Sequence, residues 1–193
     1  MQKQNRGFSL IELLIVVAII AVLAALALPT ILTAIENMKL QQTLSSYAQL
    51  QREARTAAIR TNRMVTIWLW WDAPTQQLIY YADLDGDFQL DSTEPQFMPP
   101  RSTWLQFGGA PSSASMNLPN VPQVFFPISY NSRGVLCQWN GANSCLNAGA
   151  VRHEIYFYNH RGNFVPVAWG AVTVVPGGRT KSWLWGGTSW QSR

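Results

Sequence analysis

Five of the ten acidic residues of this 193-residue chain fall in one short segment that could bind a metal ion. The segment runs from Asp83 to Glu94. The five acidic residues occupy its first, third, fifth, ninth and twelfth positions, as Asp83, Asp85, Asp87, Asp91 and Glu94. Hard oxygen ligands at this spacing suit Ca²⁺, and the pattern is typical of an EF-hand loop. Phe88 stands where that loop has its invariant glycine, and a strand pattern leads into it. A calcium site and an acidic hairpin turn without metal therefore both stay open.

The two histidines do not form a catalytic arrangement. His153 and His160 lie at the start and the end of one predicted strand, and we expect them to face opposite sides. Glu154 is adjacent to His153, and adjacent strand side chains point apart. The chain also lacks the H-E-x-x-H, G-x-S-x-G and phosphate-loop patterns. We therefore expect a protein without enzymatic activity, whose 48% of apolar residues can bury a core.

An apolar segment from Leu10 to Leu28 precedes all of these residues. As a helix it is long enough to cross most of a bilayer. Glu12 lies inside it, where a lone carboxylate costs ~2.5 kcal/mol or more near the bilayer centre, so this carboxylate needs a partner. A permanent anchor and a cleaved secretory signal, with its cleavage site at Ala25-Leu26-Ala27, are two explanations for such a segment.

The residues around Gly7 favour a third explanation. The segment reads K-x-x-R-G-F-S-L-I-E-L from Lys3 to Leu13, and it resembles the type III signal of type IV pilins and type II secretion pseudopilins. The resemblance implies that a prepilin peptidase removes residues 1–7 by cutting after Gly7 and methylates the new amine of Phe8. Residues 8–28 then stay in the inner membrane or the filament core, where Glu12 can neutralise the Phe8 amine of a neighbouring subunit. Positive residues before the span keep that end cytoplasmic and place the rest of the chain outside.

The predicted helix continues beyond the apolar segment to about Thr61, so that it covers residues 8–61. Pro29 removes a backbone donor, and we expect it either to kink or locally melt the helix near Ala25 to Leu28 or to mark the end of the span. Later positions form one apolar stripe for a sheet to cover, at Leu40, Leu44, Tyr47, Ala54 and Ala58. The opposite side is predicted to be a solvated basic face, formed by Arg52, Arg55, Arg60 and Arg63.

Residues 62–193 change to a period of two and predict a β-rich head. The expected strands are Met64–Trp71, Thr75–Asp83, Val124–Tyr130, His153–Asn159, Phe164–Trp169 and Ala171–Val175, in a mainly antiparallel sheet. Hairpin connections are expected at Asp72-Ala73-Pro74 and Arg161-Gly162-Asn163, and a long surface loop is expected from Phe97 to Pro122. The predicted fold class is α+β and pilin-like: a long N-terminal helix, transmembrane in its first half, that packs on this head.

Two segments of the head extend the resemblance to the GspH/FimT group of minor pilins and pseudopilins. Tyr130-Asn131-Ser132-Arg133-Gly134 is similar to the group's F-x-x-x-G signature, with Tyr130 in place of the common Phe. The stretch V-V-P-G-G-R-T-K, which ends at Lys181, is similar to its closing strand and G-R-x-R/K element. The resemblance implies other pilins or pseudopilins as partners. It also implies a single-pass inner-membrane protein with a periplasmic head that later joins a cell-surface filament.

The only two cysteines, Cys137 and Cys145, flank an Asn140-Gly141 turn in this exported head. Two nearby cysteines in an oxidising compartment normally form a disulfide. A loop of this length gains roughly 2 to 3 kcal/mol at most from the cross-link. We therefore expect a disulfide that pins a hairpin, because a metal site would need further ligands.

Basic residues dominate the chain after the acidic segment, and some FimT-like pilins contact DNA through a C-terminal basic element. This resemblance implies that Arg179 and Lys181 contact phosphates and that Gly177-Gly178 lets the backbone approach a ligand closely. Trp183, like the two tryptophans after it, would then stack on bases or pack beneath the arginine. Alternatively, the two basic residues are ordinary turn residues and the tryptophans cover the core of the head.

Two functions follow from these observations. One is a minor pilin or pseudopilin in a type IV pilus-like filament that binds DNA during uptake. The other is a GspH-type pseudopilin that acts at the tip of a type II secretion pseudopilus without binding DNA. Neither function requires a cofactor, and Ca²⁺ is the one ion that the sequence suggests.

Overall fold

The computed structural model describes residues 10–106, 109–141, 144–161 and 165–192. The expected processing residues Gly7 and Phe8, and Gly162-Asn163 of an expected hairpin connection, lie outside the described residues. By its internal contacts the chain divides into two compact units, Met1–Met38 and Lys39–Arg193. Helix α1 (Leu10–Thr61) begins in the first unit and ends in the second, and each unit is described by itself.

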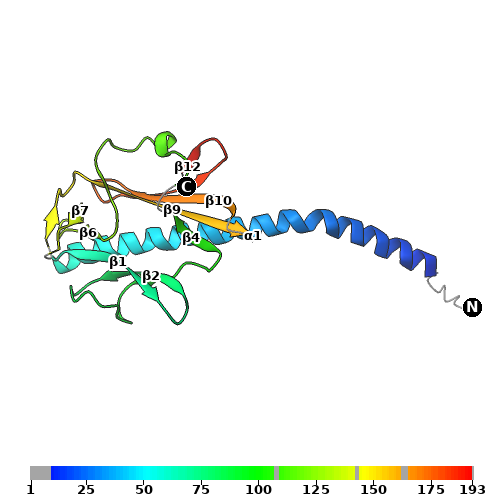
Figure 1. The fold of residues 1–193 in the computed structure, drawn as a ribbon, viewed down its shortest axis with the longest axis horizontal. Coiled ribbons are helices and arrows are strands. Elements are labelled where there is room, and N and C mark those ends of the chain that lie inside the picture. Colours follow the sequence, from blue (N-terminus) through cyan, green and yellow to red (C-terminus); the bar gives the residue numbers. More distant parts are fainter. Residues whose placement is uncertain (1–9, 107–108, 142–143, 162–164, 193) are drawn as a thin grey trace, which may run out of the picture. The chain divides into compact units, whose positions relative to one another are not determined.

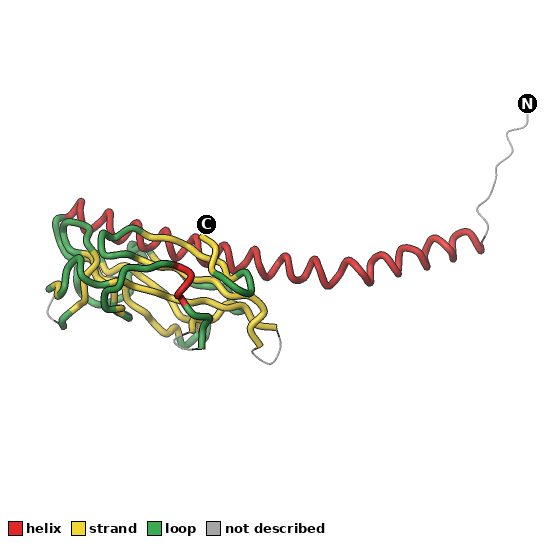
Figure 2. The backbone as a smooth tube through the Cα atoms, turned by 90° about the horizontal axis from the view of Figure 1, so that it is seen from above, coloured by secondary structure: helices red, strands yellow, loops and turns green. Residues whose placement is uncertain are grey.

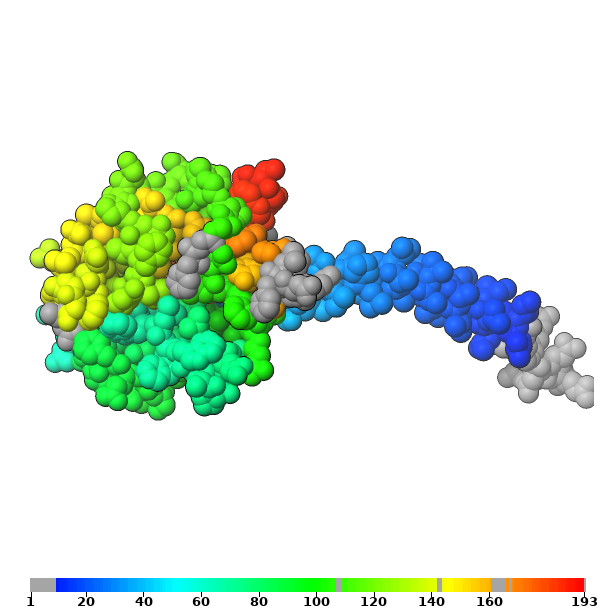
Figure 3. Space-filling view, in the orientation of Figure 1, coloured from blue at the N-terminus to red at the C-terminus, as the bar shows by residue number. Residues whose placement is uncertain are grey.

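The helical segment of the first unit has no buried side: every side chain from Leu10 to Ile35 is exposed. On the face shown in Figure 3, the blue side chains of this segment lie open to solvent. The helix runs unbroken through Ala25 to Leu28 with Pro29 inside it, so local melting is not observed (Figure 1). The hydroxyl of Thr33 donates to the carbonyl oxygen of Pro29 at 2.9 Å.

The second part of α1 is amphipathic, and it forms the central element of the second unit. All five residues of the predicted stripe are buried, together with Thr43, Ala48, Leu50, Gln51 and Ala57. Arg52, Arg60 and Arg63 are exposed as expected, whereas Arg55 is half-buried. The helix ends in a Schellman motif, because Asn62 adopts a left-handed φ of 52° and the N–H of Arg63 donates to the carbonyl of Ala58 at 3.3 Å.

The strands of the described residues form two sheets. Figure 2 shows the yellow strands beside the second part of the red helix. The first has the order β3-β2-β1-β6-β7-β8 and the second the order β12-β11-β10-β9-β4, with β5 paired to β9. The pairing of β5 with β9 is parallel and the other pairings are antiparallel. The bounds are β1 Val65–Asp72, β2 Gln77–Asp83, β3 Gln96–Phe97, β4 Thr103–Gln106, β5 Gln123–Val124, β6 Ile128–Tyr130, β7 Leu136–Trp139, β8 Cys145–Leu146, β9 Arg152–Arg161, β10 Val165–Val174, β11 Thr180–Trp185 and β12 Trp190–Ser192.

The structure confirms the α+β class with a long apolar N-terminal helix and antiparallel strands, and it corrects three details of the head. The expected loop Phe97 to Pro122 contains β4, which pairs with β9, and a 3₁₀ helix, Ser113–Met116. The expected strand Val124–Tyr130 is divided between the two sheets as β5 and β6. The two strands expected around Gly170 are one strand, β10, in which Gly170 pairs with Phe157 and Leu184. Glycine fits this position because a Cβ would lie 2.6 Å from Cδ1 of Leu44 on the helix.

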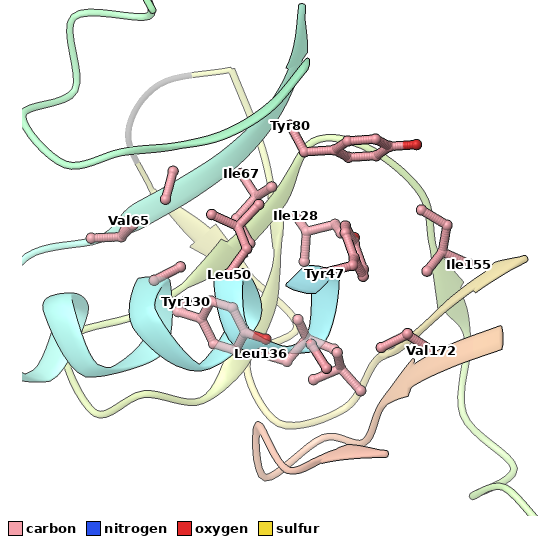
Figure 4. Close-up of a cluster of buried hydrophobic side chains, with 14 of the residues drawn as sticks. Tyr47, Leu50, Val65, Ile67, Tyr80, Ile128, Tyr130, Leu136, Ile155 and Val172 are labelled. Atoms are coloured by element: carbon pink, nitrogen blue, oxygen red, sulfur yellow. The ribbon is translucent and has the colours of Figure 1, made fainter. Parts of the chain in front are cut away.

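The hydrophobic core lies where α1 meets both sheets. Figure 4 shows Tyr47 and Leu50 of the helix among Ile67 of the first sheet and Ile155 and Val172 of the second. These side chains are at most 3% exposed. Because this helix packs against both sheets, the buried part of its surface is wider than the predicted stripe of five residues.

Candidate functional site

The acidic segment follows β2 and folds into a compact loop. Potential ligand oxygens of Asp83, Asp85 and Asp87 lie within 4.8 Å of one another. Asp83 is buried, whereas Asp85 and Asp87 are exposed. Among the described residues, the structure thus brings together three of the five expected calcium ligands, and Asp91 and Glu94 are not part of this cluster.

At Phe88 the loop has the left-handed backbone conformation that the glycine of an EF-hand loop would adopt. Both carboxylate oxygens of Asp83 accept backbone N–H groups, from Gly86 at 2.6 Å and from Phe88 at 3.2 Å. Phe88 has a φ of 63°, in the region that favours glycine. Its ring packs edge-on against Trp68 and Trp139, with centroids 5.6 and 6.1 Å away. These contacts hold a non-glycine residue in the left-handed conformation.

Glu94 closes the loop instead of joining the carboxylate cluster. Its two oxygens accept the N–H groups of Leu84 at 2.8 Å and Asp91 at 3.3 Å. Burial raises the pKa of Asp83 and of Glu94 from the ordinary value of each carboxyl group. The donor set of three carboxylates fits a hard cation such as Ca²⁺, which would also offset the mutual repulsion of the aspartates.

The expected disulfide is confirmed: Cys137 of β7 is bonded to Cys145 of β8, with Cα atoms 5.4 Å apart. Two positions after Cys137, Trp139 packs against Trp68 of β1 with centroids 4.9 Å apart. The disulfide hairpin and the acidic loop therefore share one aromatic cluster, formed by Trp68, Phe88 and Trp139.

The expected DNA-contacting residues lie at the hairpin between β10 and β11. The N–H of Val175 donates to the carbonyl of Arg179 at 3.1 Å, and Gly178 donates back to Val175 at 2.8 Å. Arg179 and Lys181 are exposed, so both cations can reach a ligand. The Nζ atom of Lys181 lies 5.5 Å from the ring centroid of Trp183.

Burial contradicts the expectation that Trp183 stacks on a base. Only 6% of this residue is exposed, and its indole N–H donates to Oγ1 of Thr173 at 2.8 Å. Trp190 is buried as well. The alternative expectation, that a tryptophan packs beneath a basic side chain, describes the contact with Lys181, although the expected partner was Arg179.

The two short signature segments of the head meet at the helix, where their glycines permit close packing. A Cβ on Gly178, whose φ is +75°, would lie 2.4 Å from the carbonyl oxygen of Gly134. That oxygen accepts a hydrogen bond from Nε of Arg55 at 2.9 Å. Gly178 therefore serves internal packing rather than the expected approach to a ligand. The same contact brings Arg133 and Arg179, both exposed, to one corner of the head.

Sequence reasoning missed a buried chain of hydrogen bonds that links the helix to both sheets. Tyr130 donates to Oε1 of Gln51, and Nε2 of Gln51 donates to the hydroxyl of Tyr47, each at 2.7 Å. That hydroxyl donates to Nε2 of His153 at 3.1 Å, because Nδ1 of His153 faces the carbonyl of Val124 at 3.0 Å and must carry the proton. The signal in the sequence was the amide of Gln51, four residues after Tyr47 inside an apolar stripe.

His153 is a neutral imidazole in this chain. Burial lowers the pKa of His153 to about 4, although the bond to Val124 and the charge of Glu154 favour its protonation. Glu154 accepts from Nε of Arg152 and from the hydroxyl of Tyr156, each at 2.6 Å. His153 and Glu154 therefore make separate sets of hydrogen bonds and do not form an acid–base pair.

Glu12 lies in the first turn of α1 and is exposed within the first unit. By length and composition, α1 is long and apolar enough to cross a membrane. The expected partner of Glu12, the amine of Phe8, lies outside the described residues.

Comparison with known proteins gives a family match at the N-terminus. The family described as "Prokaryotic N-terminal methylation motif" matches residues 2–28, which confirms the resemblance to prepilin-type proteins for that segment. Among solved structures, the chain is similar to the minor pseudopilin EpsH from the Type 2 Secretion System of Vibrio cholerae, with 15% identity and a TM-score of 0.40. That similarity covers 75% of this chain and 95% of the other. No curated protein matches the chain.

Proposed function

We propose that this protein is a minor pilin or pseudopilin that assembles into a type IV pilus-like filament. The observation that carries the proposal is the N-terminal methylation motif over residues 2–28, followed by a helix whose apolar side chains are all exposed up to Ile35. Such a surface is stable only in lipid or against other subunits. In this proposal residues 1–7 are the leader, 8–28 the membrane and filament core, and 62–193 the head.

In this proposal Glu12 determines how neighbouring subunits align, because its carboxylate pairs with the Phe8 amine of the next subunit. After cleavage the amine of Phe8 is a positive charge at the start of an apolar helix, and Glu12 of a neighbouring subunit neutralises it. A buried charge without a partner costs several kcal/mol, roughly 3 to 5 when one member of a pair is removed. Correct stacking of subunits is therefore the arrangement that pairs both charges.

Replacement of Glu12 tests the charge pair. Glu12→Gln should be cleaved and inserted like the wild type, yet its recovery in sheared filaments should fall severalfold. The control is Glu53→Gln, which removes a carboxylate from an exposed position on the same helix. Equal recovery of Glu12→Gln and Glu53→Gln in filaments would contradict the pairing.

Processing can be tested separately from assembly. A bulky residue at Gly7 should block the prepilin peptidase, so that uncleaved precursor accumulates in the inner membrane. A mature product of normal size from this variant would contradict the prepilin leader.

DNA binding by the head is the finer part of the proposal. Three exposed cations support it, since Arg133 and Arg179 share one corner and Lys181 lies two residues further on. Contacts to phosphates do not depend on base sequence, so we expect weak, sequence-tolerant and salt-sensitive binding. With Trp183 buried, base stacking by that residue makes no contribution.

Mobility shifts with duplex DNA test this activity. Arg179→Gln with Lys181→Gln should make the negative slope of log K against log salt less steep by about 1.8, because each lost phosphate contact removes about 0.9 from its magnitude. Arg101→Gln with Lys39→Gln removes the same charge elsewhere and should change the slope less. The absence of any shift with the wild type at low salt would favour the alternative, a GspH-type pseudopilin at the tip of a secretion pseudopilus.

We also propose that the acidic loop binds Ca²⁺ through Asp83, Asp85 and Asp87. The support is their convergence within 4.8 Å on a loop that already takes the left-handed turn at Phe88. Millimolar Ca²⁺ should raise the melting temperature of the wild type, and Asp87→Asn should remove the gain. Asp72→Asn, a change outside the loop, should retain it. A melting curve that responds to neither Ca²⁺ nor chelator would leave only an acidic turn.

A further inference from the structure

A cavity of about 320 Å³ lies between the β1–β2 hairpin and the segment that leads into β4. It is separate from the acidic loop, the basic corner and the polar network described above. Its volume falls in the range of small-molecule sites, which are mostly apolar with a few placed polar groups. The lining of the cavity includes Trp71, Tyr80, Arg101 and Trp104.

Two tryptophans expose their rings at this cavity. Trp71 is 55% exposed and Trp104 is 46% exposed, which is unusual for side chains of this size. The indole N–H of Trp104 donates to the carbonyl of Arg101 at 3.1 Å, so the ring is held in place and its N–H is engaged. The cavity therefore offers exposed indole rings to a ligand.

Tyr80 lines the cavity as a buried residue. The residue is fully buried, and its ring is stacked on Phe97 with centroids 5.8 Å apart. Figure 4 shows the hydroxyl at the far end of the ring, away from the helix. Among the described residues this hydroxyl has no hydrogen-bond partner. This hydroxyl has no accessible surface, so it cannot bond to a ligand in the cavity.

Arg101 gives the cavity its charge. It is the one charged side chain among the described lining residues, and the lining contains no carboxylate. One Nη2–H group donates to the carbonyl of Thr75 at 3.2 Å. A guanidinium has five N–H donors, so others can bind a carboxylate in the bidentate arrangement.

We infer that this cavity binds a carboxylated sugar ring, such as a glucuronic acid unit. The C–H groups of a sugar ring carry partial positive charge and fit the electron-rich faces of Trp71 and Trp104. The carboxylate pairs with Arg101. A proline-rich peptide is less suited, because tryptophans that recognise such peptides donate their indole N–H, which Trp104 already directs to Arg101.

Ligand-observed NMR and calorimetry on the full chain test this site, in a zwitterionic detergent without a sugar headgroup. The probes are methyl glucuronoside, methyl glucoside, acetate and a polyproline peptide. Methyl glucuronoside should bind about tenfold more tightly than methyl glucoside, since the ion pair adds to the ring contacts. Acetate and the peptide should not bind measurably.

Variants assign the contacts to residues. Trp71→Ala and Trp104→Ala should each weaken glucuronoside binding about tenfold, and Arg101→Gln should remove the preference over the glucoside. Trp70→Ala is the matched control, because Trp70 is 48% exposed on the opposite face of β1. Tyr80→Phe removes a hydroxyl that a ligand cannot reach, so it should leave the affinity unchanged and keep the melting temperature at or above that of the wild type.

Several results would overturn the inference. Equal affinity for glucuronoside and glucoside would remove the role of Arg101, and an unchanged affinity in Trp71→Ala or Trp104→Ala would remove the ring contacts. Binding of the polyproline peptide in place of the sugar would show a peptide groove. No binding of either sugar at tens of millimolar would mean that the cavity is not a sugar site.

Discussion

The buried imidazole of His153 makes the stability of the head depend on pH. In the unfolded chain this histidine titrates near 6.5, whereas burial lowers its pKa to about 4 in the folded chain. Between pH 6.5 and 4 the imidazole of His153 is protonated in the unfolded state and remains neutral in the folded state. The contribution of His153 to the free energy of unfolding is therefore fully present above pH 6.5. It decreases as the pH falls toward 4, and it does not change further below that pH.

The size of this effect follows from the two pKa values. Each unit of difference corresponds to about 1.4 kcal/mol, so acidification from pH 7 to below 4 costs roughly 3 kcal/mol through His153 alone. Asp83 and Glu94 act in the opposite direction, because their raised pKa values let the folded state bind protons more readily. The contribution of His153 must therefore be measured as a difference between two proteins.

Urea unfolding at pH 7, 6, 5 and 4 supplies this difference when wild type is compared with His153→Gln. The variant does not titrate, so its free energy of unfolding should decline less than that of the wild type, by roughly 3 kcal/mol over this range. Ile155→Val, a buried change in the same strand, should lower stability at every pH and keep the wild-type slope. Parallel pH curves for wild type and His153→Gln would refute the reasoning.

Three further changes test the packing of the head by chemical denaturation. Gly178→Ala should cost about 3 kcal/mol, because it combines a left-handed φ with a clash against a carbonyl oxygen, whereas Gly177→Ala should stay within about 0.5 kcal/mol. Equal effects would contradict the packing argument. Replacement of Cys137 and Cys145 by Ser should cost about 2 to 3 kcal/mol without loss of fold, and an unfolded variant would show a larger role. Tyr130→Phe leaves a buried amide oxygen without its donor and should cost about 1 to 3 kcal/mol, so a neutral result would argue against the network.

The helix and the class of the head were predictable because periodicity reports which side of an element is buried. Leu40, Leu44 and Tyr47 recur at helical spacing, and all three are buried in the core. The long alternating runs similarly indicated β1, β2 and β9. Short strands such as β4 escaped, because four residues between turn-forming neighbours carry too few alternations to exceed the loop signal.

Long-range contacts explain the other differences. In the sequence, Gly170 indicates the end of a strand, yet it lies inside β10. A glycine is placed there because Leu44, which is distant in sequence, occupies the space that a side chain would need. Trp183 reads as a surface aromatic beside two cations, yet its strand turns the ring inward. The buried network joins Tyr47 and Gln51 of the helix to Tyr130 and His153 of the two sheets, and sequence spacing cannot show that these separate elements meet.

The mass of the mature protein tests the central proposal most directly. Intact mass spectrometry of the protein purified from membranes should show a chain that begins at Phe8, lacks residues 1–7 and carries one added methyl group on its amine. A chain that keeps Met1 through Gly7, or one cut after Ala27, would contradict the prepilin leader and with it the assembly of this protein through its N-terminal helix.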